Sequence, residues 1–116
     1  MKKKRRNFKK KPFATIITVV KNNEKYLEHT IKSIINQSNK NFEYIVIDGN
    51  SKDKSLKIIK KYEKKIDFWI SENDKGIYDA FNKGLKLAKG KFIGFVNSDD
   101  LLEKNAIKIL REYDLK

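Results

Sequence analysis

Two adjacent aspartates, Asp99 and Asp100, follow the apolar run 91–96 and are the pair in this sequence best suited to chemistry. Neighbouring carboxylates repel each other and are costly to bury unless a cation lies between them. Their oxygens are suitable ligands for a hard divalent ion such as Mg²⁺ or Mn²⁺. An Asp pair is also typical of a loop or a helix N-cap. The pair therefore predicts a site only if other polar residues converge on it.

Polar residues also follow three other apolar runs of the chain. They are Lys21, Asn22 and Asn23; Asp48 and Gly49; and Glu72, Asp74, Lys75 and Gly76. If the runs are parallel strands, their carboxyl ends share one edge of the sheet, where ligands bind in open α/β folds. The carboxylates would converge there on a cation, and the lysines could face phosphate oxygens. A divalent metal that bridges a diphosphate fits this combination of residues.

The elements that would position these residues alternate between strands and helices. Apolar, β-branched runs predict strands over 13–20, 42–48, 66–70 and 91–96. Helical periodicity predicts helices over 22–37, 54–65, 77–89 and from about residue 103 onward. The alternation predicts an α/β fold, with a mostly parallel sheet of about four strands and helices on both faces.

Several local features of the helices can also be predicted. Asn22 or Asn23 is expected to cap the first helix. Gly84, inside the third helix, predicts close packing against the sheet or a ligand, and Gly90 is expected just after that helix as a C′ residue. The last helix is expected to keep one apolar side, formed by Ala106, Ile109, Leu110 and Tyr113.

Composition divides the chain into two parts. Residues 1–12 hold eight of the 28 Lys and Arg residues and no acid, and the formal net charge of the chain is +13. We expect 1–12 to be a disordered basic tail and 13–116 to be one folded domain. The tail could contact an anionic membrane through residues 2–11. Nucleic-acid binding is less favoured, because Phe8 is the one aromatic residue among its cations.

Several classes of site are absent from the sequence. There is no cysteine, which excludes disulfides and thiolate chemistry and suits a reducing cytosol. The single histidine, His29, falls on the polar face of the first predicted helix, so no Ser-His-Asp triad can be built around it. Neither a Walker loop nor a GxGxxG motif is present, so the usual ATPase and dinucleotide sites lack their phosphate cradle.

From Phe13 to Leu102 the sequence resembles the N-terminal, nucleotide-sugar-binding half of a family 2 glycosyltransferase with the Rossmann-like GT-A fold. The matching segments, in order, are TIITVVKNN (15–23), IKSIINQS (31–38), FEYIVIDGNSKD (42–53), ISENDKGIYDAFNKG (70–84) and GKFIGFVNSDDLL (90–102). The fourth segment is most similar to enzymes that build bacterial surface polysaccharides. The resemblance implies transfer of a sugar from a nucleotide diphosphate, with a UDP-sugar as the expected donor, in the cytoplasm or at the inner face of the membrane.

The resemblance also implies roles for individual residues. The residues implied in nucleotide-sugar binding are Val19, Lys21, Asn22, Asp48, Lys75, Gly76, Asn82 and Asp99. Asp48 would contact the base, Lys75 and Gly76 would lie near the diphosphate, and Asn82 would fix their loop. Asp99 would lie near the ribose, and Asp100 would bind the divalent metal, Mn²⁺ or Mg²⁺. The metal would offset charge on the departing diphosphate.

Three positions depart from the family pattern. Lys21 stands where an aromatic residue is often found, and Asn97 stands at the first acidic position of the metal motif. The family domain continues beyond these segments with an acceptor site and a carboxylate base, and no catalytic base is found in this chain. We therefore expect a domain that is incomplete or inactive alone, and that self-associates or binds a chain supplying the other half. The alternative is a non-enzymatic basic module, binding nucleic acid or an anionic membrane, on a degenerate glycosyltransferase remnant.

Overall fold

A computed structural model describes Met1 and residues 10–115, in which four parallel strands alternate with helices. The strands are β1 (Ala14–Val20), β2 (Phe42–Asp48), β3 (Phe68–Ser71) and β4 (Phe92–Phe95). The helices are α1 (Leu27–Ile35), α2 (Ser55–Lys61), the 3-10 helix η1 (Glu63–Lys65), α3 (Ile77–Leu87) and α4 (Ala106–Asp114). The predicted α/β fold is confirmed, and each strand lies within a few residues of its predicted position.

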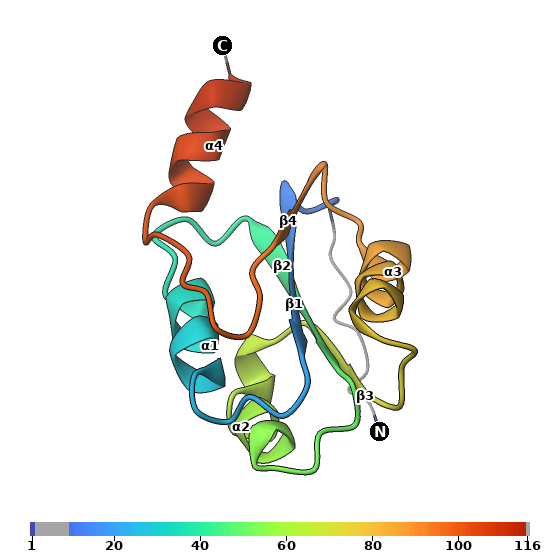
Figure 1. The fold of residues 1–116 in the computed structure, drawn as a ribbon. Coiled ribbons are helices and arrows are strands. Elements are labelled where there is room, and N and C mark those ends of the chain that lie inside the picture. Colours follow the sequence, from blue (N-terminus) through green and yellow to red (C-terminus); the bar gives the residue numbers. More distant parts are fainter. Residues whose placement is uncertain (2–9, 116) are drawn as a thin grey trace.

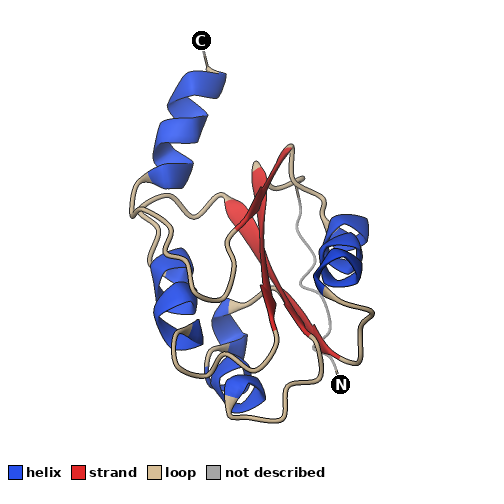
Figure 2. Cartoon of the chain, in the orientation of Figure 1, coloured by secondary structure: helices blue, strands red, loops and turns tan. Residues whose placement is uncertain are grey.

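The sheet has the order β3-β2-β1-β4, so β1 and β2 are its central strands. Helices α1 and α2 cover one face and α3 covers the other (Figures 1 and 2). Both central strands are buried along their whole length. This explains their mostly apolar sequence, because a strand covered on both faces has no side that needs polar residues.

Two apolar clusters form, one on each face of the sheet. The larger includes Ile16, Tyr44, Val46, Leu27, Ile31, Ile34 and Ile59. The smaller includes Ile17, Val19, Ile45, Ile47, Phe68 and Ala80. Gly84 brings α3 against the smaller cluster, because a Cβ added there would lie 2.7 Å from the Ile17 side chain. The close packing predicted for this glycine is therefore against the sheet.

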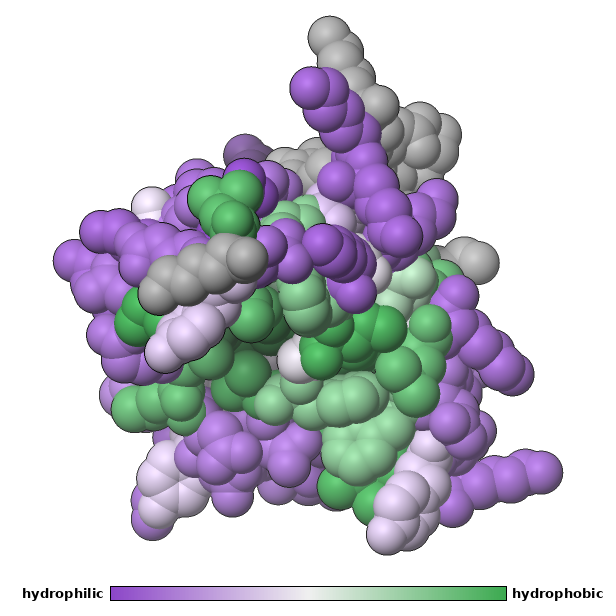
Figure 3. Space-filling view, turned by 90° about the horizontal axis from the view of Figure 1, so that it is seen from above, coloured by the Kyte–Doolittle hydropathy of each residue, from purple (hydrophilic) through white to green (hydrophobic). Residues whose placement is uncertain are grey.

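The outer edge of β4 is the least covered part of the sheet. β4 pairs with β1 alone in the described structure, and its Ile93 and Phe95 are 44% and 42% exposed. Seen from above, apolar side chains gather across the middle of the molecular face, with polar side chains around them (Figure 3). Phe95 is covered in part by Phe81 of α3, with ring centroids 4.7 Å apart.

Some local predictions were wrong for a physical reason. The N-cap of α1 is Tyr26, because the side chains of Asn22 and Asn23 have other partners. The Asn22 side-chain oxygen accepts from the Lys52 N–H, and the Asn23 side-chain amide donates to the Ser98 hydroxyl. Gly90 does not adopt a left-handed conformation. Its place is explained by close approach, since a Cβ there would lie 2.4 Å from the backbone of Ala14.

Helix α4 packs against the core through a side that matches the predicted one only in part, with Leu110 on it as expected. Ile107 is its buried residue, whereas Ile109 and Tyr113 are exposed. The helix projects beyond the sheet (Figure 1), where the Arg111 guanidinium lies over the Phe13 ring at 5.0 Å. Most of the predicted basic tail, residues 2–9, lies outside the described residues. None of the helices in the described ranges has the length and apolar character that a membrane crossing requires.

Candidate functional site

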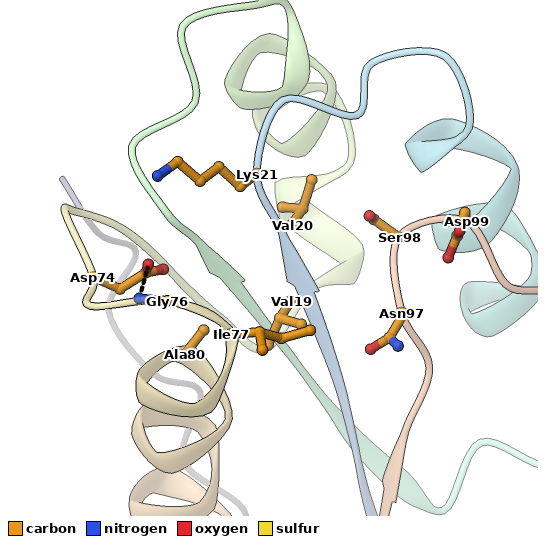
Figure 4. A pocket seen from close by; sticks show the side chains of 10 residues that line it. All are labelled: Val19, Val20, Lys21, Asp74, Gly76, Ile77, Ala80, Asn97, Ser98 and Asp99. Carbon is orange, nitrogen blue, oxygen red and sulfur yellow. Dashed lines mark hydrogen bonds between the residues drawn. The ribbon is translucent and has the colours of Figure 1, made fainter.

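A pocket of about 340 Å³ opens at the carboxyl ends of the strands (Figure 4). Its lining residues are Val19, Val20, Lys21, Asp74, Gly76, Ile77, Ala80, Asn97, Ser98 and Asp99. The end of β1 forms its floor, the loop from β3 into α3 forms one wall, and the segment after β4 forms the other (Figure 4). This is the edge of the sheet at which the sequence predicts convergence, and it is where ligands bind in open α/β folds.

Asp48, at the end of β2, is fully buried and holds neighbouring loops together. Its carboxylate accepts hydrogen bonds from the Ser51 N–H at 3.1 Å and the Ser51 hydroxyl at 2.5 Å. It also accepts one from the Ser71 hydroxyl of β3 at 2.6 Å. Asp48 is therefore not part of the pocket lining, and both of its carboxylate oxygens are engaged by the protein.

The loop after β1 is tied to the loop after β2. Asn22, with φ of +51°, donates its backbone N–H to the Ser51 hydroxyl at 2.8 Å and accepts from the Lys52 N–H at 2.7 Å. Asn23 extends the connection to the far wall, because its side-chain amide donates to the Ser98 hydroxyl at 2.9 Å. Asn22 lies beside the pocket without lining it, and Lys21 is exposed at its rim.

A carboxylate in the same loop region shows how the backbone groups are used. Burial alone would raise the pKa of Asp53, but hydrogen bonds from the backbone N–H groups of Ser55 and Glu24 outweigh it. The pKa of Asp53 is therefore below its usual value. This acid stays charged because the fold supplies its donors, so it has little reason to bind a metal.

The acidic motif after β4 is held by its backbone and leaves its carboxylates exposed. The Asp100 N–H donates to the Asn97 carbonyl at 3.0 Å, and the Thr30 hydroxyl donates to the Asp100 carbonyl at 2.6 Å. Within the described residues, the side chains of Asp99 and Asp100 have no hydrogen bond or ion pair. Asn97 Oδ1 is buried and has no hydrogen-bond partner there either. A buried acceptor without a donor is unfavourable, and Asn97 is one of the residues that line the pocket.

The loop from β3 into α3 is fixed by residues other than the expected one. The Lys75 N–H donates to Asp79 at 2.9 Å, and the Lys83 ammonium donates to the Asn73 carbonyl at 3.0 Å. Asn82 is exposed on α3 and makes no hydrogen bond to this loop within the described structure, so the role of fixing the loop falls to Asp79 and Lys83. Gly76, with φ of +111°, lines the pocket, whereas Lys75 stands next to it.

The donor atoms at the acidic motif fit a divalent cation that a ligand helps to hold. The described residues contain no cluster of three or more His, Cys, Asp and Glu side chains that could enclose a metal. Mg²⁺ and related ions in phosphate sites are commonly held by one or two carboxylates, with the remaining ligands coming from phosphates and water. Asp99 and Asp100, both exposed and unpaired there, supply such a partial set.

The structure brings together part of the predicted set and adds residues to it. Of the nine residues named for nucleotide sugar and metal, the pocket lining contains Val19, Lys21, Gly76 and Asp99. Asp74, Asn97 and Ser98 are the polar lining residues to which no role was assigned. The sequence placed all three after strands, but it did not show which oxygen atoms the fold leaves without a donor.

Comparison with known proteins gives a consistent result. The family model described as "Glycosyl transferase family 2" matches residues 15–114. An uncharacterized glycosyltransferase of Haemophilus influenzae is 37% identical over 100 residues, which are 84% of this chain and 40% of that protein. The poly(ribitol-phosphate) beta-N-acetylglucosaminyltransferase TarP of Staphylococcus aureus is 36% identical over 104 residues, 85% of this chain and 32% of TarP. The chain thus spans less than half the length of the curated relatives it matches.

Solved structures agree with the sequence matches. A crystal structure of S. aureus TarS in complex with UDP-GlcNAc superposes with a TM-score of 0.79 and 31% identity, covering 86% of this chain and 30% of that one. The mannosyltransferase PcManGT of Pyrobaculum calidifontis, solved with GDP-Man and Mn²⁺, has a TM-score of 0.74 and 22% identity over 88% of this chain and 33% of that one. The second match shows the shared GT-A fold.

Proposed function

The chain belongs to glycosyl transferase family 2, and from this premise we propose that it binds a nucleotide-diphosphate sugar together with a divalent metal. In this proposal it is the donor-binding part of an enzyme that transfers the sugar to an acceptor in polysaccharide or glycan biosynthesis. A UDP-sugar is the proposed donor, because the related TarS has been solved with UDP-GlcNAc.

One observation carries this proposal: acceptor atoms that the protein leaves without donors lie around a pocket at the strand ends. Asn97 Oδ1 is buried without a partner, and the carboxylates of Asp99 and Asp100 are exposed on the same segment. Groups that serve only the fold are normally paired, as those of Asp48 are here. A cation and the hydroxyl groups of a ligand would satisfy the two exposed carboxylates.

We assign the metal to the side chain of Asp100 and the ribose hydroxyls to Asp99. When bound, the metal would supply positive charge that stabilises the leaving diphosphate. The chain's own residues position the donor, because Val19 and Val20 give the pocket an apolar floor. The proposal covers donor binding, and no residue is assigned to remove a proton from the acceptor.

The test is calorimetric titration of UDP and UDP-GlcNAc with and without Mn²⁺. Mn²⁺ should tighten UDP binding to the wild-type chain by about tenfold or more, or ~1.4 kcal/mol. Asp100→Ala should remove this Mn²⁺ effect without unfolding the domain, because the Asp100 side chain has no partner in the described structure.

The matched control is Glu112→Ala, which removes one exposed acid from α4. This variant should keep the wild-type response to Mn²⁺. The proposal is wrong if no nucleotide binds, or if Asp100→Ala and Glu112→Ala respond to Mn²⁺ alike.

A further inference from the structure

Asp74 lies directly over Gly49 at one end of the pocket. A Cβ added to Gly49 would lie 2.6 Å from Asp74 Oδ2, well inside van der Waals contact. Gly49 follows β2 and Asp74 belongs to the loop after β3, so the two residues meet only in the folded chain. The absence of a side chain at residue 49 thus makes room for the Asp74 carboxylate, which lines the pocket.

The two carboxylate oxygens of Asp74 differ in their hydrogen bonding. Oδ1 accepts a hydrogen bond from the Gly76 N–H at 3.1 Å, which fixes the orientation of the carboxylate. Oδ2 has no hydrogen-bond partner within the described residues. The preceding residue is also held, because Asn73 Oδ1 accepts from the Asn50 side-chain amide at 2.9 Å. Asp74 is therefore an oriented acceptor with one oxygen left for a ligand.

The position of Asp74 indicates which part of a nucleotide it would meet. Lys21 and Asp74 lie on one side of the pocket, and Asn97, Ser98 and Asp99 lie on the other (Figure 4). The sheet order places the ends of β3 and β2 on the far side of β1 from the acidic motif. If the diphosphate is at the metal carboxylates, the base extends toward Gly49 and Asp74. Neighbouring strands are about 4.8 Å apart, so this end is roughly 10 Å from the end of β4.

We propose that Asp74 reads the nucleobase by accepting a hydrogen bond on Oδ2 from a ring N–H, and so selects uracil or guanine over cytosine or adenine. This inference rests on the proposed nucleotide-sugar binding and deepens it. Uracil and guanine carry a hydrogen on the ring nitrogen of their pairing edge, whereas cytosine and adenine have a lone pair there. A carboxylate is only an acceptor, so it attracts the first pair of bases and repels the lone pair of the second.

Gly49 contributes to the same base recognition by making room for the Asp74 carboxylate. An alanine at residue 49 would displace the Asp74 carboxylate by its Cβ alone, because the neighbour is the far end of a flexible side chain. The backbone of Gly49 is not in the left-handed region, so alanine is not strained there. Gly49→Ala should therefore disturb base recognition through Asp74 while it leaves the charge of the pocket unchanged.

The experiment measures binding of UDP and CDP, and of GDP and ADP, with Mn²⁺ in every titration. The wild-type chain should bind UDP at least about tenfold more tightly than CDP, which corresponds to ~1.4 kcal/mol. Asp74→Asn should lower this ratio to one or below, because Oδ1 stays on the Gly76 N–H and the new amide N–H₂ faces the base as a donor. Such a donor suits the ring nitrogen of cytosine.

Gly49→Ala is the second, independent arm. Alone, Gly49→Ala should lower the ratio of UDP affinity to CDP affinity severalfold. In an Asp74→Ala background it should change this ratio by less than twofold, because the carboxylate that it displaces is gone. The inference is overturned if both single variants keep the wild-type ratio while UDP binding still depends on Asp100; the proposed function would then stand without it. If the wild-type chain binds none of the four nucleotides with Mn²⁺, both proposals are wrong.

Discussion

The loops after β1 and β2 and the loops after β3 and β4 are equally polar, but they use their polar groups in opposite ways. After β1 and β2, side chains satisfy one another: Asp48 takes hydrogen bonds from Ser51 and Ser71, and Asn22 is joined to the same loop. After β3 and β4, acceptor oxygens of Asp74, Asn97, Asp99 and Asp100 remain without protein donors in the described structure.

This difference separates scaffold from binding surface better than residue type does. Asp48 and Asp99 are both aspartates at strand ends, yet one is fully buried and the other is exposed. A paired, buried carboxylate contributes to the stability of the fold, whereas an exposed one without a protein partner contributes little to stability and is free to bind a ligand. The two pairs of loops should therefore respond in opposite ways to substitution.

The largest effect is expected for Asp48→Ala. The change leaves the Ser51 N–H and the hydroxyls of Ser51 and Ser71 without their acceptor, and the free energy of unfolding should fall by about 3 kcal/mol. Urea denaturation measures it. Asp99→Ala is the matched control and should stay within about 0.5 kcal/mol of wild type. Equal losses for the two variants would break the distinction between the loops.

Asn97→Leu should separate binding from stability. Leucine removes a buried acceptor that has no donor, so the unfolding midpoint should be unchanged or higher. UDP binding with Mn²⁺ should nevertheless weaken by about tenfold, or ~1.4 kcal/mol. Parallel denaturation and calorimetry would show this. A clear loss of stability with unchanged binding would instead place Asn97 with the scaffold residues.

Asn23→Ala tests the side-chain bridge between the loop after β1 and the segment after β4. The Asn23 amide donates to the Ser98 hydroxyl across the pocket, and loss of this bond should lower the free energy of unfolding by about 1 kcal/mol. Ser98→Ala should then add little in the Asn23→Ala background. Additive losses in this double-mutant cycle would mean that the bridge is not coupled.

The smallest effect is expected at Glu28, which joins α1 to the C-terminal end of α2 at the surface. Hydrogen bonds from Lys61 and Tyr62 lower the Glu28 pKa from 4.5 to about 2. The folded-state pKa is depressed, so the stabilisation is fully present above pH 4.5 and is lost as the pH falls toward 2. Glu28→Gln should show a small loss of stability at pH 6 that disappears near pH 2 in thermal melts. A pH-independent difference would contradict this origin.

The sequence predicted the fold well because the spacing of apolar residues and their burial determine where the strands of the sheet lie. Its central strands are covered on both faces, and such strands have apolar runs that can be recognised without any tertiary information. The N-cap at Asn22 or Asn23 was mispredicted because the side chains of both residues have tertiary partners, Lys52 after β2 and Ser98 after β4. Local capping preferences are weak enough for such contacts to override them.

The candidate site was predictable in part for the same reason. The acidic pair stands out after a strand, and the family resemblance suggested its role. The meeting of Gly49 with Asp74 depends on two loops that are distant in sequence, and so does the burial of Asn97 Oδ1. No local sequence pattern shows which acceptor oxygen lacks a hydrogen-bond donor in the folded chain, so these two features could be found only from the structure.

The strand order has a consequence for how the site comes into existence during synthesis. β1 is translated first and β4 last of the four strands, yet they are neighbours, with Ala14 in register with Phe92. Proteins emerge from the ribosome N-terminus first, and long-range strand pairing is slow. The three-stranded part β1–β2–β3 can therefore assemble before the acidic motif arrives to complete the pocket. A nucleotide and a metal that contact both sides of the pocket would favour, by mass action, the state in which β4 is paired with β1. The concentration of nucleotide sugar in the cell would then also increase the fraction of this domain that is fully folded.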